Sequence, residues 1–531
     1  MWRCTVVGAG RRDQRWKGLT MSRAISRRTL LKTTAAGGAL ALAQFPRGAA
    51  AQGATTLKFA TGTDAVTMDP HMAVDIPSAR AFLQVHETLV AAGQDGQVRG
   101  VLAESWTTSP DGLAWTFKLR KGVSFSDGTP FNAAAVKYNY DRLADPAMGS
   151  PRRVGATAGI AGVNVVDDET VEFRTATPLA PLLLRLAHYN FAIMSPKAAQ
   201  AAGKNYSLTP IGTGPFVMSK WSRDETMTFT RNETYWGPKP KLASLEFRTV
   251  PEDNTRLLML LSGDTHLISN VTPVMVPRLK GSPKVALLQE PSTRTIYLGL
   301  NRSIAPFDKP QVREAVAAAI DYKSIVEQVL RGFATQGGAF DPPFIPGSVA
   351  LPPYTFDPER AKKLLAEAGL PNGFSADFYF TTGRYLNDKD VAQAIQAQLA
   401  KVGIKLNMQS PEFGTFMGVI SAKKAGMFMA GKGNPAFDLD GGLSLYVTTG
   451  GGMNYTNYAD PEMDKLVAQQ RTIIDPVERQ KVLKTILEKI RADAPELVLY
   501  YEQMLFAAQS NVKGVVITPN EYVSFVNATI S

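Results

Sequence analysis

A strand, a helix and a second strand follow one another in the C-terminal half of this 531-residue chain, and this order constrains the fold most. Residues 376–380 and 404–408 have the apolar patterns of strands. An amphipathic helix is predicted between them over about 389–402, with Asp388 as its N-cap and Gly403 just past its end. The core face of this helix is predicted to consist of Val391, Ile395, Leu399 and Val402. This order predicts a β-α-β unit and hence an α/β fold.

Helix starts of one kind recur in the same half of the chain. At each of them an Asp is closely followed by a Pro, and the two residues suit a first helical turn for different reasons. The Asp side chain accepts hydrogen bonds from free backbone N–H groups, and Pro lacks the N–H that the first turn could not use. These starts are Asp308-Lys309-Pro310, Asp357-Pro358, Asp460-Pro461 and Asp475-Pro476. We interpret them as scaffold and assign them no chemistry.

The first 51 residues are predicted to be an export leader. Residues 26–32 resemble a twin-arginine export motif, and residues 49–51 fit a cleavage site made of small residues. The weakly apolar run between them, residues 33–43, has about half of the ~20 residues that cross a bilayer; the alternative is an ordinary buried helix. Met21 is a plausible start, which would make the first 20 residues a gene-model extension. We therefore expect a soluble periplasmic protein, exported by the twin-arginine pathway.

Charge and cysteine content narrow the range of partners. The chain carries a net charge of +11, but the predicted leader holds ten Lys and Arg against one acid, which leaves +2 for the rest. The basic isoelectric point therefore gives no support to a nucleic-acid or membrane-surface partner. Cys4 is the single cysteine and lies in the leader, so the predicted mature chain has no disulfide, no thiolate metal site and no lipid anchor.

The length of the chain predicts more than one lobe. About 480 residues follow the leader, whereas single hydrophobic cores stop growing near ~250–300 residues. The sequence shows no internal repeat and no low-complexity linker that would divide it. We therefore expect two or more lobes that are joined by short crossings.

The sequence offers no set of residues that catalysis would need. The four histidines have no metal-ligand spacing: His71, His86, His188 and His266. Residues 86–90 have Val where a zinc-protease helix needs a second His, and neither a nucleophile elbow nor a phosphate-binding loop motif occurs. Residues 212–215 could cradle an anion but are more simply a tight turn, and Asp167-Asp168 is best explained as a pair of solvated acids. We therefore predict a protein that is not an enzyme and has no cofactor and no metal site.

Residues 115–133 predict a strand, two turns and the start of a helix. The strand places on one face the side chains of Trp115, Phe117 and Leu119. Turns are expected at Gly122 and at Asp127-Gly128, and a helix is expected from about Asn132. This stretch closely resembles the signature of family 5 of the ABC-transporter solute-binding proteins, the dipeptide, oligopeptide and nickel type.

Other stretches resemble the same family in the same order, from about residue 56 to residue 528. They are residues 68–70, 87–90, 102–106, 212–216, 231–236, 301, 312–315, 319–321, 361–369 and 493–497. The resemblance implies a type II periplasmic-binding-protein fold, with two lobes around a cleft and an extra subdomain on the first lobe. The implied parts are lobe I at 52–80, 207–293 and 503–531, the extra subdomain at 81–206, and the distal lobe at 294–502, with hinge crossings near 290–296 and 500–505.

The resemblance also implies a function. Members of the family hold an extended peptide between the lobes, where main-chain hydrogen bonds treat it as an added strand and an Asp pairs with its α-ammonium group. Closure buries the ligand, and an inner-membrane permease with its ATPase subunits recognises the closed form. We therefore expect a monomeric receptor for a peptide-like solute. Modified peptides, opine-like compounds and oligosaccharides are the next ligand classes. An exported hydrolase, or a chaperone or sensor with the same fold, is the alternative function.

One segment departs from the family pattern at the place that binds the peptide ammonium group. The family form is Gly-Trp-x-x-Asp-x-x-Asp-Pro, and its ungapped match is residues 431–439, where Lys432 replaces the Trp and Pro435 replaces the first Asp. Only Asp438 fits, and a gap of one residue would offer Asp438 or Asp440. A buried ammonium group without a partner costs several kcal/mol, so the departure counts against a peptide with a free N-terminus.

Further ligand-binding candidates are polar or aromatic residues that also have an ordinary structural explanation. Asp64 lies in the loop after the strand predicted at 56–60, and Arg384 and Tyr385 follow the strand at 376–380. Such sites use a few polar groups among aromatic side chains. The full predicted set is Asp64, Arg384, Tyr385, Asp438, Asp440, Tyr446, Asn454 and Tyr501.

Overall fold

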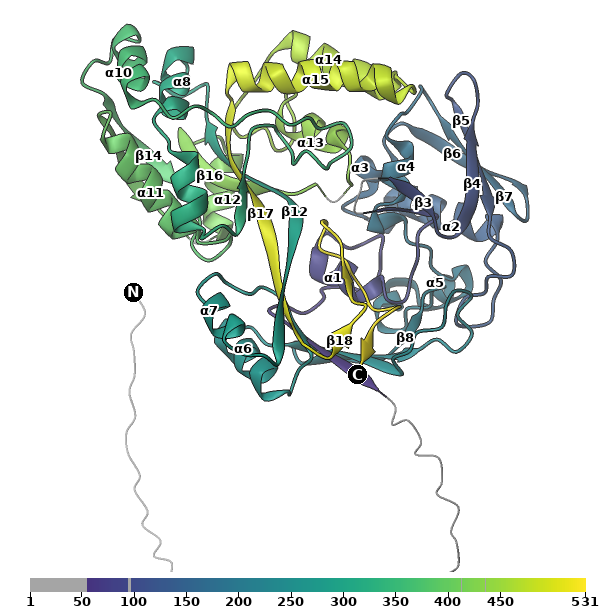
Figure 1. The fold of residues 1–531 in the computed structure, drawn as a ribbon. Helices are drawn as coiled ribbons and strands as arrows, with labels where there is room; N and C mark the ends of the chain where they lie inside the picture. The colour runs from purple at the N-terminus through teal and green to yellow at the C-terminus, as the bar shows by residue number, and fades with distance from the viewer. Residues whose placement is uncertain (1–54, 94–96, 412, 435) are drawn as a thin grey trace, which may run out of the picture. The chain divides into compact units, whose positions relative to one another are not determined.

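Figure 1 shows a computed structural model of the chain, which describes residues 55–93, 97–411, 413–434 and 436–531. The predicted leader and Cys4 lie outside these residues. Residues 54–531 form one compact unit. Strands and helices alternate along this unit, which agrees with the predicted α/β class. Within the described residues, no helix is long and apolar enough to span a membrane.

The largest sheet joins segments from both ends of this unit. Its strand order is β15-β14-β16-β12-β17-β11-β1-β10-β9-β8, and β13 pairs with β17 off this path. The strands are β1 (Thr56–Thr61), β8 (Phe216–Ser222), β9 (Thr226–Arg231), β10 (Ser244–Thr249), β11 (Leu267–Ile268), β12 (Val285–Leu300), β13 (Ala334–Gln336), β14 (Phe374–Tyr379), β15 (Ile404–Gln409), β16 (Met427–Lys432) and β17 (Glu496–Gln509).

Strands β12 and β17 are the longest of the sheet and run antiparallel side by side (Figure 1). Their pairing is regular up to Pro291, which lies opposite Gln503, and resumes at Thr295 opposite Tyr501. Three residues of β12 therefore face a single residue of β17. Such an irregularity bends a strand pair locally and interrupts its ladder of hydrogen bonds.

The predicted β-α-β unit is confirmed. Strands β14 and β15 pair in parallel, and the connecting helix α11 spans Asp388–Ala400. Its predicted core face is buried in the structure. The predicted N-cap was wrong by one residue, because Asn387 caps the helix with a positive φ of 48° and Asp388 is its first residue. The Asp388 carboxylate instead accepts hydrogen bonds from the backbone of the preceding loop.

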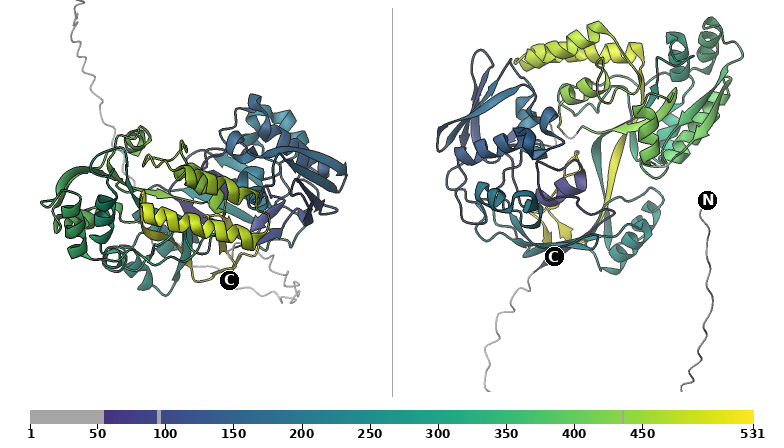
Figure 2. Two further views of the ribbon diagram at one scale, coloured as in Figure 1. Left: turned by 90° about the horizontal axis from the view of Figure 1, so that it is seen from above. Right: turned by 180° about the vertical axis from the view of Figure 1, so that it is seen from behind.

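Three of the four predicted Asp-Pro helix caps in the C-terminal half are confirmed. They are α8 (Pro310–Ala318), α9 (Tyr322–Ser324), α10 (Pro358–Glu367), α12 (Phe413–Ser421), α13 (Leu439–Tyr446), α14 (Pro461–Thr472) and α15 (Pro476–Asp493), with a π-helical turn at Ile325–Val329. Asp357, Asp460 and Asp475 cap α10, α14 and α15 through their side chains. At α8 the cap is Lys309 without a side-chain hydrogen bond, so the prediction for Asp308 was wrong. Helices α14 and α15 lie side by side (Figure 2).

A second, four-stranded sheet contains the stretch that carried the family resemblance. Its order is β4-β5-β7-β6, with β4 at Ala103–Thr108, β5 at Ala114–Leu119, β6 at Ile160–Asp167 and β7 at Thr170–Thr175. The predicted inward face of β5 is buried, and Gly122 and Gly128 adopt positive φ of 71° and 79° in the two turns. Asn132 caps α2 (Ala133–Ala144) by accepting a hydrogen bond from Ala135 N–H at 3.0 Å. This local prediction is confirmed.

The remaining elements are short. They are α1 (Ile76–Phe82), β2 (Val90–Ala92), β3 (Val98–Gly100), α3 (Arg153–Thr157), α4 (Leu182–Leu186), α5 (Pro196–Ala202), α6 (Asp253–Ser262), α7 (Val276–Lys280), β18 (Val512–Lys513), β19 (Val516–Ile517), β20 (Val523–Ser524) and β21 (Thr529–Ile530), with 3₁₀ turns at Pro146–Met148, Tyr189–Phe191 and Gly203–Leu208.

Separate apolar cores lie under different parts of the sheets. One core is built mainly from residues 296–500 around α8, α11 and the strands β14 to β16. Another joins β1, β9 and β10 to the C-terminal end of β17, and a further core fills the space between α2 and the four-stranded sheet. Several cores are what a chain of this length requires. The boundaries of the lobes and of the extra subdomain stay a prediction.

Candidate functional site

The connection between β16 and α13 is held against the loop before α11. Strand β16 ends at Lys432, and Gly431 has no side chain where the ring of Tyr385 approaches it. A Cβ atom on Gly431 would lie 2.6 Å from this ring and 2.8 Å from a side-chain carbon of Ile296. Only glycine allows this contact, which places Arg384 and Tyr385 beside the start of the connection. These two predicted residues are therefore brought together with the segment that departs from the family pattern.

Asp438 is buried and engaged by an arginine. Arg479 of α15 donates two hydrogen bonds of 2.8 Å to its two carboxylate oxygens. Asp438 also accepts a hydrogen bond of 2.8 Å from Asp440 N–H and so caps α13. Burial lowers the pKa of Arg479, but the adjacent carboxylate outweighs this effect and raises it above its ordinary value.

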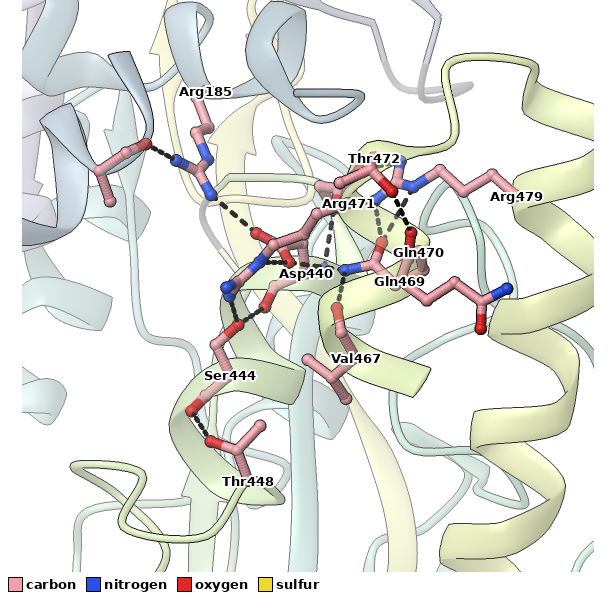
Figure 3. Close-up of polar contacts among 12 residues, drawn as sticks. Arg185, Asp440, Ser444, Thr448, Val467, Gln469, Gln470, Arg471, Thr472 and Arg479 are labelled. Carbon is pink, nitrogen blue, oxygen red and sulfur yellow. Dashed lines mark hydrogen bonds and ion pairs between the residues drawn. The ribbon is translucent and has the colours of Figure 1, made fainter. Parts of the chain in front are cut away.

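Asp440 lies at the centre of a larger polar cluster (Figure 3). Its side chain is 1% exposed and accepts hydrogen bonds from Arg185 at 2.8 Å, from Gln470 at 2.6 Å and from Arg471. Burial raises the pKa of Asp440, but the two guanidinium groups lower it by more, so that it lies below the ordinary value. Arg185 comes from α4, so this cluster connects the region of the four-stranded sheet to α13 and α14.

Lys432 is buried among aromatic rings and acids. Its ammonium group pairs with Glu496 of β17 and lies 3.1 Å from the ring centre of Phe340. Burial lowers the pKa of Lys432 and raises that of Glu496, and the ion pair between them opposes both effects. Nearby, burial raises the pKa of Asp341 to about 6, although Asn434 donates a hydrogen bond of 2.7 Å to its carboxylate. The rings of Tyr297 and Tyr446 complete the surroundings of Lys432 at 5.0 and 5.3 Å.

A second charged cluster lies where the pairing of β12 and β17 is interrupted. Arg294 donates a hydrogen bond of 2.8 Å to Glu521 and lies 3.5 Å from Glu502. Arg80 of α1 donates a hydrogen bond of 3.2 Å to the backbone carbonyl of Glu521. Burial raises the pKa of Glu521, but Arg294, Arg80 and Arg384 together lower it below its ordinary value. This cluster joins the strands β12 and β17 to the turn between β19 and β20.

Arg384 is exposed and stacks its guanidinium group over the rings of Tyr385 at 5.2 Å and Phe413 at 5.7 Å. This guanidinium group forms no hydrogen bond or ion pair with any residue that the structure describes. Tyr385 donates a long hydrogen bond of 3.4 Å to the carbonyl oxygen of Gly431. The loop itself is fixed, because Asp388 accepts hydrogen bonds from the N–H groups of Gly383 and Arg384 at 2.9 and 3.0 Å. Arg384 is therefore a cation held on a rigid loop, and its guanidinium group has no hydrogen-bonded or ion-paired partner among the described residues.

The other predicted residues have polar groups that the chain itself engages. Asp64 accepts hydrogen bonds from Trp221 at 3.0 Å and from Asp224 N–H at 2.9 Å, at the edge of a pocket that Arg80 also lines. The Tyr501 hydroxyl bonds to the backbone of residues 338 and 339. Asn454 donates to the carbonyl oxygens of Thr448 and Tyr458, and Tyr446 packs its ring against Tyr297 and Phe340. Their role in ligand binding stays a prediction.

Sequence reasoning missed the cations around the two predicted aspartates. Arg185, Arg471 and Arg479 lie far from Asp438 and Asp440 in the sequence, and no local pattern distinguishes them from exposed arginines. Lys432 was noticed only as a departure from the family form. Among the residues that the structure describes, no group of three His, Cys, Asp or Glu side chains could hold a metal ion.

Comparisons with known proteins give the family. The sequence model of the bacterial extracellular solute-binding proteins, family 5 (middle), matches residues 97–454. The glutathione-binding protein GsiB of Escherichia coli K12 is 32% identical over 520 residues, which are 96% of this chain and 100% of that protein.

Two solved structures resemble the chain closely. The periplasmic binding protein DppA from Helicobacter pylori, in complex with the peptide STSA, is 30% identical with a TM-score of 0.74, over 90% of this chain and 98% of that one. The binding protein AgaA from Agrobacterium tumefaciens R10, in complex with agropinic acid, is 27% identical with a TM-score of 0.74, over 90% and 99%. These relatives are solute-binding proteins and not enzymes. The chain therefore belongs to the family 5 bacterial extracellular solute-binding proteins and is a solute receptor with the type II periplasmic-binding-protein fold.

Proposed function

We propose that this protein is the periplasmic receptor of an ABC importer that binds a peptide-like solute between two closing lobes and delivers it to the membrane permease and its ATPase subunits. The observation that carries the proposal is Arg384, an exposed cation on a rigid loop next to Gly431. Its guanidinium group forms no hydrogen bond or ion pair with the described residues. A guanidinium group binds carboxylates through two parallel hydrogen bonds, and a peptide-like solute provides a carboxylate.

The proposal includes the division of the chain. Lobe I comprises 52–80, 207–293 and 503–531, the extra subdomain 81–206 and the distal lobe 294–502. The separate apolar cores support this division. The interrupted pairing between Pro291 and Thr295 supports a hinge near 290–296 and 500–505, because hinges absorb closure in a few backbone angles.

We propose that all the residues predicted from the sequence belong to the ligand-binding site. Arg384 and Tyr385 contact the solute directly. Asp438, Asp440 and Tyr446 shape the neighbouring segment through their contacts within the chain. Asp64, Asn454 and Tyr501 hold loops in place. We further propose export by the twin-arginine pathway, a monomeric state, and the absence of catalysis and of nucleic-acid binding.

Native mass spectrometry of the mature protein purified from periplasm tests the proposed function. We expect a bound species of peptide-like mass in a 1:1 complex, which dissociates on denaturation. A sugar or an opine in its place would contradict the ligand class but keep the receptor role; the relative that holds agropinic acid makes the opine the second candidate. Turnover that is lost on a single substitution near Arg384 would support a hydrolase instead.

A further inference from the structure

The acids beside the proposed solute site are all engaged by the chain itself. The four buried carboxyl groups on or next to the connection between β16 and α13 each have a cation or an amide as their partner. The pairs are Asp438 with Arg479, Asp440 with Arg185 and Arg471, Glu496 with Lys432, and Asp341 with Asn434. A solute ammonium group would have to displace one of these partners, and the displaced group would lose its hydrogen bonds in a buried place.

The chain also places an ammonium group of its own in this region. Lys432 Nζ lies over the ring of Phe340 and pairs with Glu496, with two tyrosine rings beside it. Aromatic faces and a carboxylate are what a bound ammonium ion requires. Here the side chain of Lys432 already uses them, and that side chain is 2% exposed.

The contact between α4 and α13, beside the proposed solute site, is also made by a cation of the chain itself. Arg185 of α4 reaches Asp440 of α13, and a backbone hydrogen bond of 2.8 Å from Ala180 N–H to the carbonyl oxygen of Arg471 lies in the same contact. Leu184 packs with Phe437 beside them. Arg185 therefore joins α4 to α13, and this contact needs no charge from the solute.

From these three observations and the guanidinium group of Arg384, which is unpaired among the described residues, and on the basis of the proposed function, we propose that the solute carries a carboxylate and no free ammonium group, with Arg185 occupying Asp440 in place of a solute ammonium ion. N-substituted or N-acylated amino-acid conjugates and N-blocked peptides fit this chemistry. Peptides with a free N-terminus fit it less well, because all four buried acids on or next to the described part of the connection between β16 and α13 already have partners within the chain.

Calorimetric titration with three matched probes tests the inference: trialanine, N-acetyl-trialanine and trialanine amide. We expect N-acetylation to weaken binding by less than about threefold or to strengthen it, and amidation of the carboxyl end to weaken it by at least about tenfold. An N-acetyl probe that binds about tenfold more weakly than trialanine overturns the inference but leaves the proposed function intact. Binding of none of the three contradicts both the inference and the peptide-like function.

An Arg185→Gln variant adds an independent readout. We expect this substitution to weaken the binding of free and of N-acetylated trialanine by the same factor of at least about threefold. The reason is that it removes a contact of the closed state and not a contact with the solute. Arg185→Lys should restore part of the affinity. Arg174→Gln, at an exposed ion pair with Glu172, is the control and should change nothing. If Arg185→Gln instead strengthens binding of free trialanine alone, Asp440 is a site for a solute ammonium group and the inference is wrong.

Discussion

At the scale of single residues, the buried pair of Lys432 and Glu496 offers a direct test of how the site is held. Lys432→Met removes the cation and leaves a buried carboxyl group without its partner, which should lower the free energy of unfolding by about 3 kcal/mol. The double variant Lys432→Met with Glu496→Gln should lose less than the single variant, since residue 496 no longer leaves a buried carboxylate without its partner. Urea unfolding of the three proteins measures the difference. Equal losses in the single and double variants would show that the two residues are not coupled.

Two histidines predict a pH dependence of stability. Burial lowers the pKa of His86 to about 4, and that of His71 to about 3, so both are neutral in the folded protein near neutral pH. In the unfolded chain a histidine takes up a proton below about pH 6.5. The unfolded state therefore binds more protons between the two pKa values, and stability should fall as the pH decreases through this window.

For His86 alone this loss amounts to about 3 kcal/mol by pH 4. Thermal unfolding from pH 7 to pH 4 measures it, and a His86→Asn variant should show a shallower slope even if it is less stable throughout. An identical slope in wild type and variant would contradict the role of His86.

The sequence could not predict which residues form hydrogen bonds and ion pairs with the predicted site residues. Asp438 and Asp440 were predicted because they stand in a recognisable segment, and the structure does place both next to the connection after β16. Their arginine partners come from α4, α14 and α15, so that the burial and charge of both acids are decided by the tertiary fold. Asp64 and Asn454 illustrate the same point, because their hydrogen bonds arise from loop geometry that a one-dimensional pattern does not contain.

At the scale of elements, the start of α11 positions the loop that carries Arg384. The Asp388 carboxylate accepts hydrogen bonds from Thr381, from the backbone of residues 383–385 and from Lys389 N–H. Asp388→Ala should therefore lower the free energy of unfolding by about 2–4 kcal/mol and weaken solute binding as the loop loses its anchor. Asp390→Ala, in the same helical turn but exposed, is the matched control and should leave binding unchanged.

Chemical denaturation and calorimetric titration of both variants separate the two effects. If Asp388→Ala loses the expected free energy of unfolding but binds solute like the wild type, the loop does not contribute to the solute site. If neither stability nor binding changes, the hydrogen bonds to Asp388 do not hold the loop.

Elements with a strong local signal were predicted well from the sequence. The face of β5, the two glycine turns after it and the Asn132 cap all follow from residues close together in the chain. The errors lie at boundaries, where neighbouring residues compete for one role. Asn387 takes the cap of α11 because Asp388 turns its side chain to the preceding loop, and Lys309 takes the cap of α8 in place of Asp308.

At the scale of the whole molecule, we propose a receptor that closes on its solute. The family and the α/β class were visible in the sequence, because many ordered stretches resemble the family and residues 376–408 predict a β-α-β unit. The interrupted pairing of β12 and β17 was not visible, since register between strands about 200 residues apart depends on the packing around both. Ligand that binds only the native state raises its stability by mass action, so closure can be detected without knowing the solute beforehand.

Thermal unfolding with a panel of N-acetylated and free di-, tri- and tetrapeptides, run on the wild type and on Arg384→Gln, tests whether the protein is a peptide receptor that binds its solute through Arg384. Arg360→Gln, at an exposed ion pair on α10, serves as the control. We expect that at least one peptide raises the unfolding temperature of the wild type and of the control by several degrees, and that this shift is lost in Arg384→Gln. No shift with any peptide, or a shift of equal size in Arg384→Gln, would contradict it.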